Sequence, residues 1–230
     1  LLLTSLLAAA SADGEYQPFM YSVDINQQGN ASTFSCLRSN QYGVVIIRAY
    51  KPNERGEVDG NAIDNIHLAY NANLGVEVYM SPNPTSSKTG ATQVDEMLTA
   101  LRNGGITVRA MWIQVISPYI WYQNTTDNLN FVNSALNRIR ARGVRPGVYT
   151  NKDDWQWITN DASQLGTDVW LWYFNVNDAG VAGETAPNFD DFRKFGNWNG
   201  AAVKQFGQNE DVCGLTVNRD VYPASDLEIF

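Results

Sequence analysis

Carboxyl groups in or at the ends of apolar strands are the residues of this sequence with the clearest chemical potential. Asp24 ends a first apolar segment, Glu77 lies inside a later one, and Asp220 lies in the last one. Glycoside hydrolysis uses two carboxyl groups about 5–10 Å apart, one of which donates a proton. The pattern therefore predicts glycosidase chemistry, with Asp24 as the first catalytic carboxylate and Glu77 or Asp220 as alternative carboxylates.

Two of these carboxylates also have a structural interpretation. Asp24 could cap the loop after its strand or form an ion pair with Arg48. Glu77 could point into the fold, on the same side of its strand as Tyr79, or it could pair with Arg109 on the neighbouring strand. For Asp24 and for Glu77, the sequence leaves both the catalytic and the structural interpretation open.

Aromatic and amide side chains near strand ends predict a sugar-binding groove. The chain has 7 Trp and 11 Tyr, and ring faces beside amides and carboxylates suit sugar rings, although most such rings pack in a core. Gln114 lies on a buried strand and needs hydrogen-bond partners, so we expect it to line a polar cavity. The residues predicted for the glycan groove are Tyr79, Gln114, Trp172, Tyr173 and Asn218.

Other kinds of site lack the residues that they need. His67 is the only histidine and falls inside a predicted helix, so we expect no metal site, no Ser–His or Cys–His nucleophile, and no cofactor. The net charge is −8, and we identify no basic footprint for nucleic acid or an anionic membrane surface. No apolar stretch reaches the roughly 20 residues of a membrane span.

Strands and helices alternate along the chain, which is typical of parallel strands joined by helical crossovers. Five strand–helix units followed by three strands predict a single α/β domain, a modified TIM-like (β/α)5β3 barrel. In such barrels functional residues lie at the carboxyl ends of strands. The predicted strands are 19–25, 44–49, 76–80, 108–116, 146–150, 169–174, 202–206 and 215–221. The predicted helices run from Ser32 or Thr33 to about Asn40, and over 59–73, 92–102, 128–142 and 153–159.

The first twelve residues follow the pattern of a secretory signal. They are apolar and end in Ala10-Ser11-Ala12, a small-residue cleavage pattern. We therefore predict that residues 1–12 are a signal peptide remnant and that residues 13–230 form the barrel domain. The alternative is a buried N-terminal helix.

Cysteine and asparagine patterns agree with secretion. Cys36 and Cys213 are the only cysteines, and in a secreted chain we expect them to form a disulfide, with two buried free thiols as the alternative. Asn30 and Asn124 each begin an Asn-x-Ser/Thr pattern and are predicted glycosylation sites. We expect a secreted monomer.

Several short motifs together resemble glycoside hydrolase family 25, the lysozymes that cleave peptidoglycan between muramic acid and glucosamine. The resemblance spans nearly all of residues 20–222. The segments Phe34-Ser35-Cys36 and Val212-Cys213-Gly214 resemble the paired cysteines of its nematode and protist branch. The other matching segments are Tyr21-Ser22-Val23-Asp24-Ile25, Val45-Ile46-Ile47-Arg48-Ala49, Val76-Glu77-Val78-Tyr79, Gly147-Val148-Tyr149-Thr150 and Lys204-Gln205-Phe206.

The resemblance implies a barrel lysozyme whose usual acids are partly replaced. Asp24 matches the first-strand aspartate of the family, but the fourth-strand Asp-x-Glu pair corresponds to Gln114 and Ile116, and the last-strand aspartate corresponds to Asn218. Isoleucine cannot donate a proton, and loss of a general acid costs about 10²–10⁴ in rate. We therefore expect a secreted protein that hydrolyses or binds bacterial peptidoglycan in defence or digestion. The alternative is a non-catalytic glycan-binding or signalling protein on the same barrel.

Overall fold

The computed structural model describes residues 19–223, so the predicted signal peptide lies outside the described residues. The strands are β1 (Phe19–Ile25), β2 (Val44–Lys51), β3 (Glu57–Val58), β4 (Gly75–Met80), β5 (Ala110–Gln114), β6 (Arg145–Thr150), β7 (Trp170–Phe174), β8 (Val203–Val212) and β9 (Leu215–Pro223). The helices are α1 (Ala31–Ser39), α2 (Ala62–Asn71), α3 (Gly90–Asn103), α4 (Thr125–Ala141) and α5 (Lys152–Thr159), with short 3-10 turns η1 (Pro118–Ile120) and η2 (Val181–Gly183). None of the helices between residues 19 and 223 is long and apolar enough to cross a membrane.

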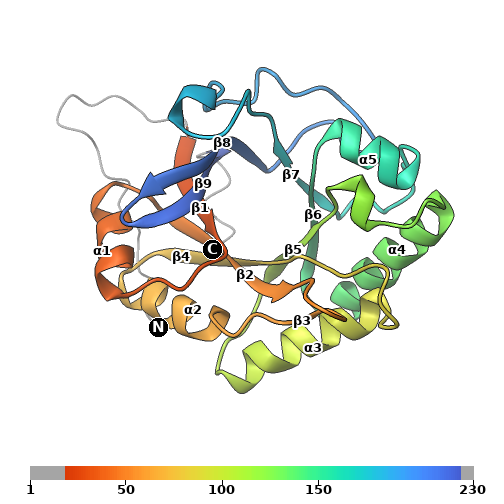
Figure 1. Ribbon diagram of the computed structural model, residues 1–230, viewed down its shortest axis with the longest axis horizontal. Helices are drawn as coiled ribbons and strands as arrows, with labels where there is room; N and C mark the ends of the chain where they lie inside the picture. The colour runs from red at the N-terminus through yellow and green to blue at the C-terminus, as the bar shows by residue number, and fades with distance from the viewer. Residues whose placement is uncertain (1–18, 224–230) are drawn as a thin grey trace.

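The sheet closes into a barrel, which confirms the predicted α/β barrel class. β1 pairs with both β2 and β9, and these pairings close a ring that also contains β4, β5, β6, β7 and β8 (Figure 1). The pairings from β1 through β2 and β4 to β8 are parallel, whereas β9 runs antiparallel to both of its neighbours. The short strand β3 pairs only with β2 and was not predicted. Closure leaves no open edge inside the ring.

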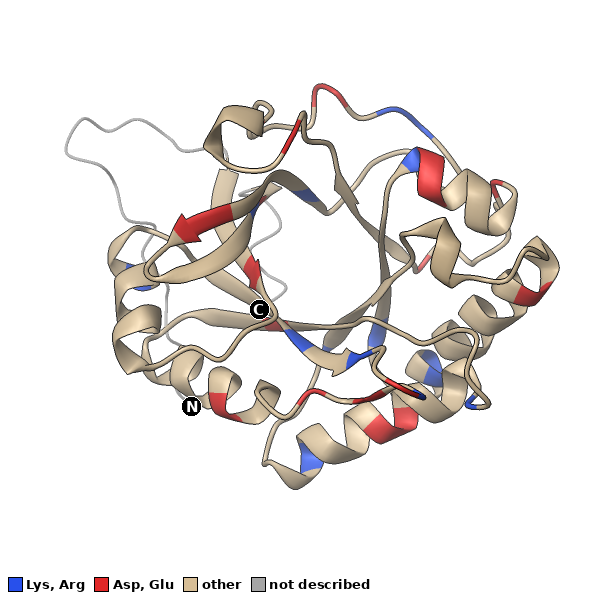
Figure 2. Ribbon diagram, viewed as in Figure 1, with Lys and Arg blue, Asp and Glu red and all other residues tan. Residues whose placement is uncertain are grey.

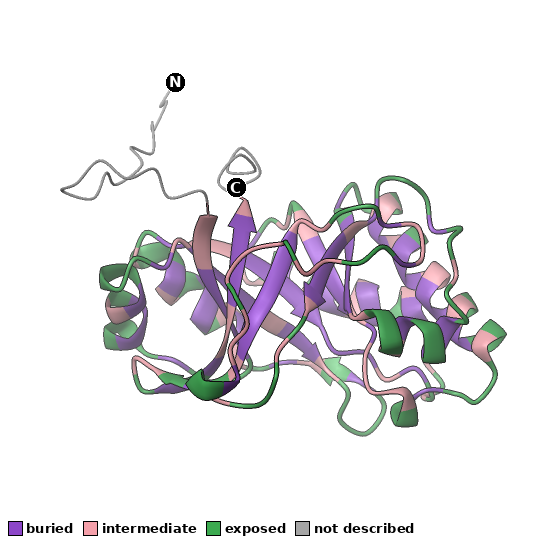
Figure 3. Cartoon of the chain, turned by 90° about the horizontal axis from the view of Figure 1, so that it is seen from above, coloured by how far each residue is buried: buried purple, intermediate pink, exposed green. Residues whose placement is uncertain are grey.

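Helices cover one part of the barrel wall and a long loop covers the rest. The helices α1, α3, α4 and α5 follow the ring strands β1, β4, β5 and β6, and α2 follows β2 and the short β3. The segment between β7 and β8 contains only the short turn η2 (Figure 1). Seen from above, the strands are largely buried and the exposed positions lie on the helices and loops around them (Figure 3). This arrangement gives the sheet one inner and one outer face, both of them packed.

Four of the five helices begin slightly earlier than predicted, and each of these has a side-chain cap, whereas α2 has none and begins at Ala62 instead of residue 59. The side chain of Asn30 accepts a hydrogen bond from the backbone N–H of Thr33, so α1 starts at Ala31 instead of Ser32 or Thr33. Thr89 and Asn124 cap α3 and α4 in the same way. Asx and threonine caps satisfy backbone N–H groups that have no partner inside the helix. The two predicted glycosylation residues, Asn30 and Asn124, are therefore exposed helix caps.

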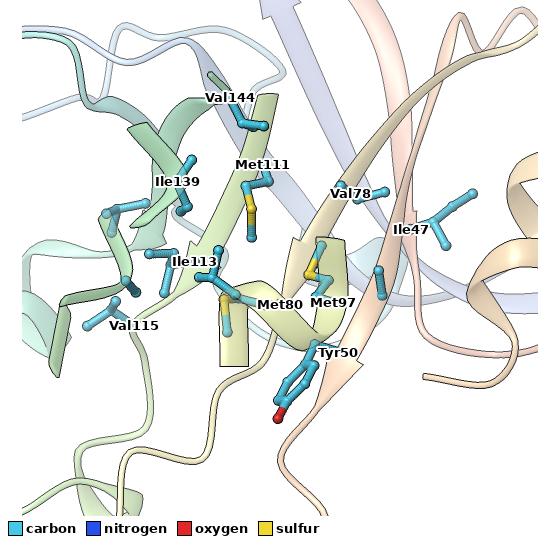
Figure 4. Packing of buried hydrophobic residues seen from close by; sticks show 14 of the residues in the cluster. Ile47, Tyr50, Val78, Met80, Met97, Met111, Ile113, Val115, Ile139 and Val144 are labelled. Carbon is cyan, nitrogen blue, oxygen red and sulfur yellow. The ribbon is translucent and has the colours of Figure 1, made fainter. Parts of the chain in front are cut away.

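The outer core lies between the strands and the helices. Side chains such as Ile47, Met80, Met111 and Ile113 point outward from β2, β4 and β5 and belong to the same cluster as Met97 of α3 (Figure 4). Because side chains alternate along β5, Met111 and Ile113 point outward, whereas Trp112 and Gln114 face the barrel interior.

The inner core is small and aromatic. It is formed by the inward-facing side chains Val44, Ile46, Tyr79, Trp112, Tyr149, Trp172, Val203 and Tyr222. The indole of Trp112 fits because its neighbour on β6 is Gly147, where an added Cβ would lie 2.2 Å from the ring. The barrel is therefore filled by rings below the ends of its parallel strands, and the polar side chains lie above and between them.

The disulfide between Cys36 and Cys213 is present, and among residues 19–223 there are no free cysteines. It joins α1 to the turn between β8 and β9, across 177 residues of sequence. The bond therefore ties the first helix to the strand that closes the ring.

Candidate functional site

The candidate site is the end of the barrel at which the parallel strands finish, here called the barrel mouth. Its inward-facing polar residues come from six strands that are far apart in sequence. They are Asp24, Tyr79, Gln114, Tyr149, Gln205 and Asn218. Functional groups gather at this end in α/β barrels because loops and strand ends converge there.

Asp24 is held at the mouth by two amide side chains. Gln205 Nε2 donates to Asp24 Oδ2 at 2.6 Å, and Asn218 Nδ2 donates to Asp24 Oδ1 at 3.1 Å. Asp24 and Asn218 are direct partners in the register of β1 and β9. The predicted alternative of an ion pair with Arg48 does not form, because Arg48 binds Asp59 at 2.8 Å.

Burial makes Asp24 a weak acid. It raises the pKa of the carboxyl group to about 7, and the hydrogen bonds from Asn218 and Gln205 oppose that shift only in part. A buried carboxylate loses hydration, which neutral amide donors do not fully replace. Asp24 can therefore hold its proton in mildly acidic solution, as a general acid must.

The amide network extends from Gln205 to its neighbours. Gln205 Oε1 accepts a hydrogen bond from Tyr149 Oη at 2.9 Å and one from Gln208 Nε2 at 2.5 Å. Asn218 Oδ1 accepts from the backbone N–H of Asn209 at 3.1 Å. These bonds fix which amide atoms face Asp24, so both amides present N–H groups to its carboxylate.

Gln114 and Ile116 lie on the opposite side of the mouth from these amides. Gln114 Oε1 accepts a hydrogen bond from Ser81 Oγ at 2.5 Å, which supplies the buried-strand glutamine with a partner, and Gln114 is only partly buried. Ile116 packs against the inner aromatic core just beyond β5. The two positions at which the family resemblance places acids therefore carry an amide and an alkyl group.

Glu77 and Asp220 lie deeper in the barrel, below the mouth. Glu77 Oε2 accepts hydrogen bonds from Trp112 Nε1 at 2.5 Å and from Tyr222 Oη at 2.7 Å. Glu77 thus points into the barrel, and the expected alternative of a pair with Arg109 does not form. Burial raises the pKa of Glu77, an effect that these hydrogen bonds partly oppose.

Asp220 is completely buried. Its Oδ1 accepts from Trp172 Nε1 at 2.8 Å, and its Oδ2 has no hydrogen-bond partner among the described residues. Burial, followed by the charge of Asp24, raises the pKa of Asp220 well above its ordinary value. A neutral carboxyl group in this position is the form that its surroundings favour.

Two predicted groove residues occupy other places. Tyr173 points out of the barrel, where its hydroxyl donates to Asp191 at 2.6 Å and its ring packs on Phe189 and Phe192. The expectation that it faces the groove is corrected, because Trp172 beside it faces inward and adjacent strand residues point to opposite faces. Trp172 is 1% exposed and lies beneath Tyr149, at 4.2 Å between ring centroids, so it forms the floor of the mouth.

One carboxylate near the mouth was not predicted from the sequence. Asp154 lies in the first turn of α5 and accepts a hydrogen bond from the backbone N–H of Ser117 at 3.3 Å, directly after Ile116. Burial raises its pKa. Its only sequence signal was an acidic residue three positions after the cap residue Asn151, which is common in helices that do no chemistry. Tyr149 and Gln205 are further site residues that were not predicted, although both lie near the ends of predicted strands, 146–150 and 202–206.

Asp24→Asn is expected to raise the stability of the folded protein at alkaline pH. Because the folded-state pKa of about 7 lies above the ordinary 3.8, the folded protein keeps this proton between these values and the unfolded chain does not. Wild-type stability therefore falls as pH rises through that window. Above pH 7 the wild type has lost at most about 4 kcal/mol of its free energy of unfolding in this way, and the variant does not undergo this loss.

Urea denaturation of wild type and Asp24→Asn near pH 4 and near pH 8 measures this effect. The stability difference should grow in favour of the variant at the higher pH. The exposed Asp153 provides the control, since Asp153→Asn should show no such growth. A constant difference between wild type and Asp24→Asn at both pH values would contradict the assignment of a raised pKa.

The site geometry contains no obvious metal centre. Among residues 19–223 no group of three or more His, Cys, Asp or Glu side chains could hold a metal ion. The groups that the barrel mouth offers for chemistry are the carboxyl group of Asp24, which is 5% exposed, several amides and a floor of aromatic rings, with Asp154 at the rim.

Comparisons with known proteins agree with this barrel. Residues 15–206 match the family model described as Lysozyme-like protein 1. Lysozyme-like protein 7 of Caenorhabditis elegans is 48% identical over 209 residues, covering 91% of this chain and 74% of the relative. The probable GH family 25 lysozyme 2 of Dictyostelium discoideum is 32% identical over 202 residues, covering 87% of this chain and 90% of the relative.

A solved structure gives the same fold. The bacterial lysozyme from Streptomyces coelicolor superposes with a TM-score of 0.72 at 18% identity, covering 91% of this chain and 94% of that chain. At that identity the likeness concerns the fold, whereas the two sequence relatives and the family model establish kinship. The chain belongs to the lysozyme-like proteins of glycoside hydrolase family 25.

Proposed function

We propose that this protein binds the glycan strands of bacterial peptidoglycan at the barrel mouth. The observation that carries the proposal is the network in which Asp24 meets Gln205 and Asn218, and in which Gln205 is bound by Tyr149, whose ring packs on Trp172. Amide and carboxyl groups are suited to sugar hydroxyl and acetamido groups, and a rigid network loses little freedom on binding. Membership of a lysozyme family supports peptidoglycan as the source of that glycan.

Binding is favoured over rapid turnover because Asp24 is the one acid among the six inward-facing residues of the mouth, whereas Asp154 lies at the rim on α5, where it accepts a hydrogen bond from the backbone of Ser117. Two-carboxylate hydrolysis needs a group on each side of the scissile bond. Glu77 and Asp220 are buried below the mouth and accept hydrogen bonds from indole N–H groups, so a sugar ring would not reach them. Gln114 and Ile116 replace the remaining acids. We therefore infer that wall glycan is held at the mouth with little or no cleavage.

A second candidate function is slow hydrolysis with Asp24 as the proton donor. The raised pKa of Asp24, about 7, favours this candidate because a general acid must be protonated at the working pH. The acid would protonate the glycosidic oxygen while the bond to the anomeric carbon breaks and water attacks that carbon. Without a base on the other side, the rate would be lower by about 10²–10⁴.

The two candidates separate in one experiment on purified, insoluble peptidoglycan. Co-sedimentation measures binding, and release of soluble sugar fragments measures cleavage, for wild type and Asp24→Asn. Binding without released fragments in either protein supports the binding function. Fragments that appear with wild type and disappear with Asp24→Asn support slow hydrolysis. Failure of wild type to co-sediment contradicts both.

A pair of aromatic variants tests whether the mouth is the binding surface. Phe174 is partly buried at the end of β7 and packs against Tyr149, at 5.4 Å between ring centroids. Phe174→Ala should weaken co-sedimentation about tenfold, which corresponds to the loss of one aromatic contact. Tyr70→Ala removes a ring that is 49% exposed on α2, outside the barrel, and should leave binding unchanged. Equal losses in both variants would indicate unspecific adhesion.

We further propose that the protein is secreted as a monomer and acts in antibacterial defence or in digestion. The disulfide supports an oxidising compartment, since such bonds persist outside the cytosol. The apolar pattern of residues 1–12 supports the same route. Fractionation of a culture expressing the complete natural protein, followed by size-exclusion chromatography of the medium, tests both points.

A further inference from the structure

A cavity lies at the end of the barrel opposite the mouth, where the parallel strands begin. It has a volume of about 700 Å³, and its lining includes the arginines Arg109, Arg140 and Arg145. Arg145 is the first residue of β6, and its register partner Ala110 is the first residue of β5. The cavity is therefore separated from the barrel mouth by the length of the strands.

The arginines of this cavity differ in whether their charge is matched. Arg140 donates to both carboxylate oxygens of Asp168, at 2.7 and 2.8 Å, so its charge is balanced. The guanidinium groups of Arg109 and Arg145 form no ion pair and no hydrogen bond with any described residue. Two unmatched cations therefore line one cavity.

The neighbouring arginines show that carboxylates are available nearby and are used elsewhere. Arg138 of α4 and Arg142, directly after the end of that helix, both pair with Asp95 of α3, at 3.4 and 2.6 Å. In Figure 2 the positively charged positions at the starts of β5 and β6 lie close to those of α4. This local group of arginines occurs although the whole chain carries a net charge of −8.

Arg145 is also held in place. Its guanidinium carbon lies 4.2 Å from the centroid of the Trp170 ring, a cation–π arrangement. Stacking restricts the plane of the guanidinium and leaves its N–H groups free to donate at the edge. A preoriented arginine loses less freedom when it binds an anion.

We propose that this cavity binds the phosphate group of a small phosphorylated molecule, through Arg109 and Arg145. A phosphate dianion accepts paired N–H bonds from guanidinium groups and can bridge two of them. The volume exceeds that of a phosphate ion and lies in the range of small-molecule sites, about 300–1,000 Å³. Sites of this kind work in acidic proteins because the local field, not the net charge, acts on a bound ion.

Isothermal titration of the complete folded protein with inorganic phosphate tests the proposal. Wild type should bind one phosphate per chain in a saturable manner at low ionic strength. Arg109→Gln and Arg145→Gln should each weaken binding about tenfold or more, as expected for loss of a charge-assisted pair. Arg145→Lys should fall between them and wild type, because it keeps the charge and loses the fork.

The control variant is Arg38→Gln, which removes an exposed arginine of α1 that does not line the cavity. It should bind phosphate as wild type does. Titration with acetate in parallel should give weaker binding, since a carboxylate carries one charge. Absence of saturable phosphate binding by wild type would overturn the proposal, as would equal weakening in Arg38→Gln.

Thermal unfolding of each variant without ligand keeps the test interpretable. The replaced side chains are exposed, so the variants should unfold at temperatures close to that of wild type. A variant that unfolds normally and binds phosphate as tightly as wild type shows that its arginine is not a ligand. Because the probe is phosphate alone, the result does not depend on peptidoglycan binding at the mouth.

Discussion

Replacing Gln114 by Asp and Ile116 by Glu together is expected to raise peptidoglycan cleavage by about 10²–10⁴. Asp24 already lies at the mouth with a raised pKa, and the double change supplies acids across from it, at the two family positions that lack them. Asp at position 114 keeps an oxygen that can accept the hydrogen bond from Ser81. Glu at position 116 would lie at the edge of the inner core, where partial burial favours its protonated form. Release of soluble fragments from purified walls measures the gain.

A neutral double variant separates acid chemistry from changes in shape. Gln114→Asn with Ile116→Gln places polar groups of similar size at both positions without adding a proton donor, so it should show no gain. Adding Asp24→Asn to the acidic double variant should remove most of the gain. If the folded acidic variant cleaves no faster than the neutral one, the barrel mouth differs from an active lysozyme in more than these two residues.

Removing the disulfide, by Cys36→Ala with Cys213→Ala, is expected to lower the free energy of unfolding by about 5 kcal/mol. The bond joins residues separated by 177 positions, and a loop of that length strongly restricts the unfolded chain. Domains of this kind have total stabilities of about 5–15 kcal/mol, so the variant should be close to unfolding at body temperature. Urea denaturation of wild type and variant gives the difference.

Reduction of the wild-type protein provides the matching control. Treatment with a thiol reductant should shift the wild-type urea midpoint toward that of the double alanine variant and should leave the variant unchanged. A variant that loses less than about 1 kcal/mol would mean that the unfolded chain keeps α1 close to the β8–β9 turn without the bond.

The barrel and its main carboxylates were predictable because they depend on local patterns. The alternation of short apolar strands with amphipathic helices specified the α/β class, and the position of Asp24 at a strand end pointed to the mouth. Alternation along β4 also allowed Glu77 to face inward with Tyr79. The same rule, applied to the adjacent pair Trp172 and Tyr173, would have shown that only one of them faces inward.

The partners of these residues were not predictable, because they are distant in sequence. Gln205 and Asn218 reach Asp24 across 181 and 194 positions, and nothing in either segment identifies its partner. The strand β3 has only two residues and exists through its pairing with β2. Arg109 and Arg145 lack ion-pair partners because Asp95 and Asp168 pair with other arginines, and those pairs exist only in the folded protein.

The pairing of β1 with β9 affects how the protein can fold during its synthesis. Asp24 leaves the ribosome early, whereas Asn218 and the strand that carries it emerge almost two hundred residues later. During synthesis β1 and β8 are therefore sheet edges that wait for the same late partner, and exposed edges invite pairing with other chains. The hydrogen bonds from Gln205 and Asn218 to Asp24 cannot form before the barrel closes. A nascent chain therefore lacks this site until its synthesis is nearly complete. The pairing of β9 with β1 and β8 therefore completes the site and covers the exposed strand edges at the same late stage.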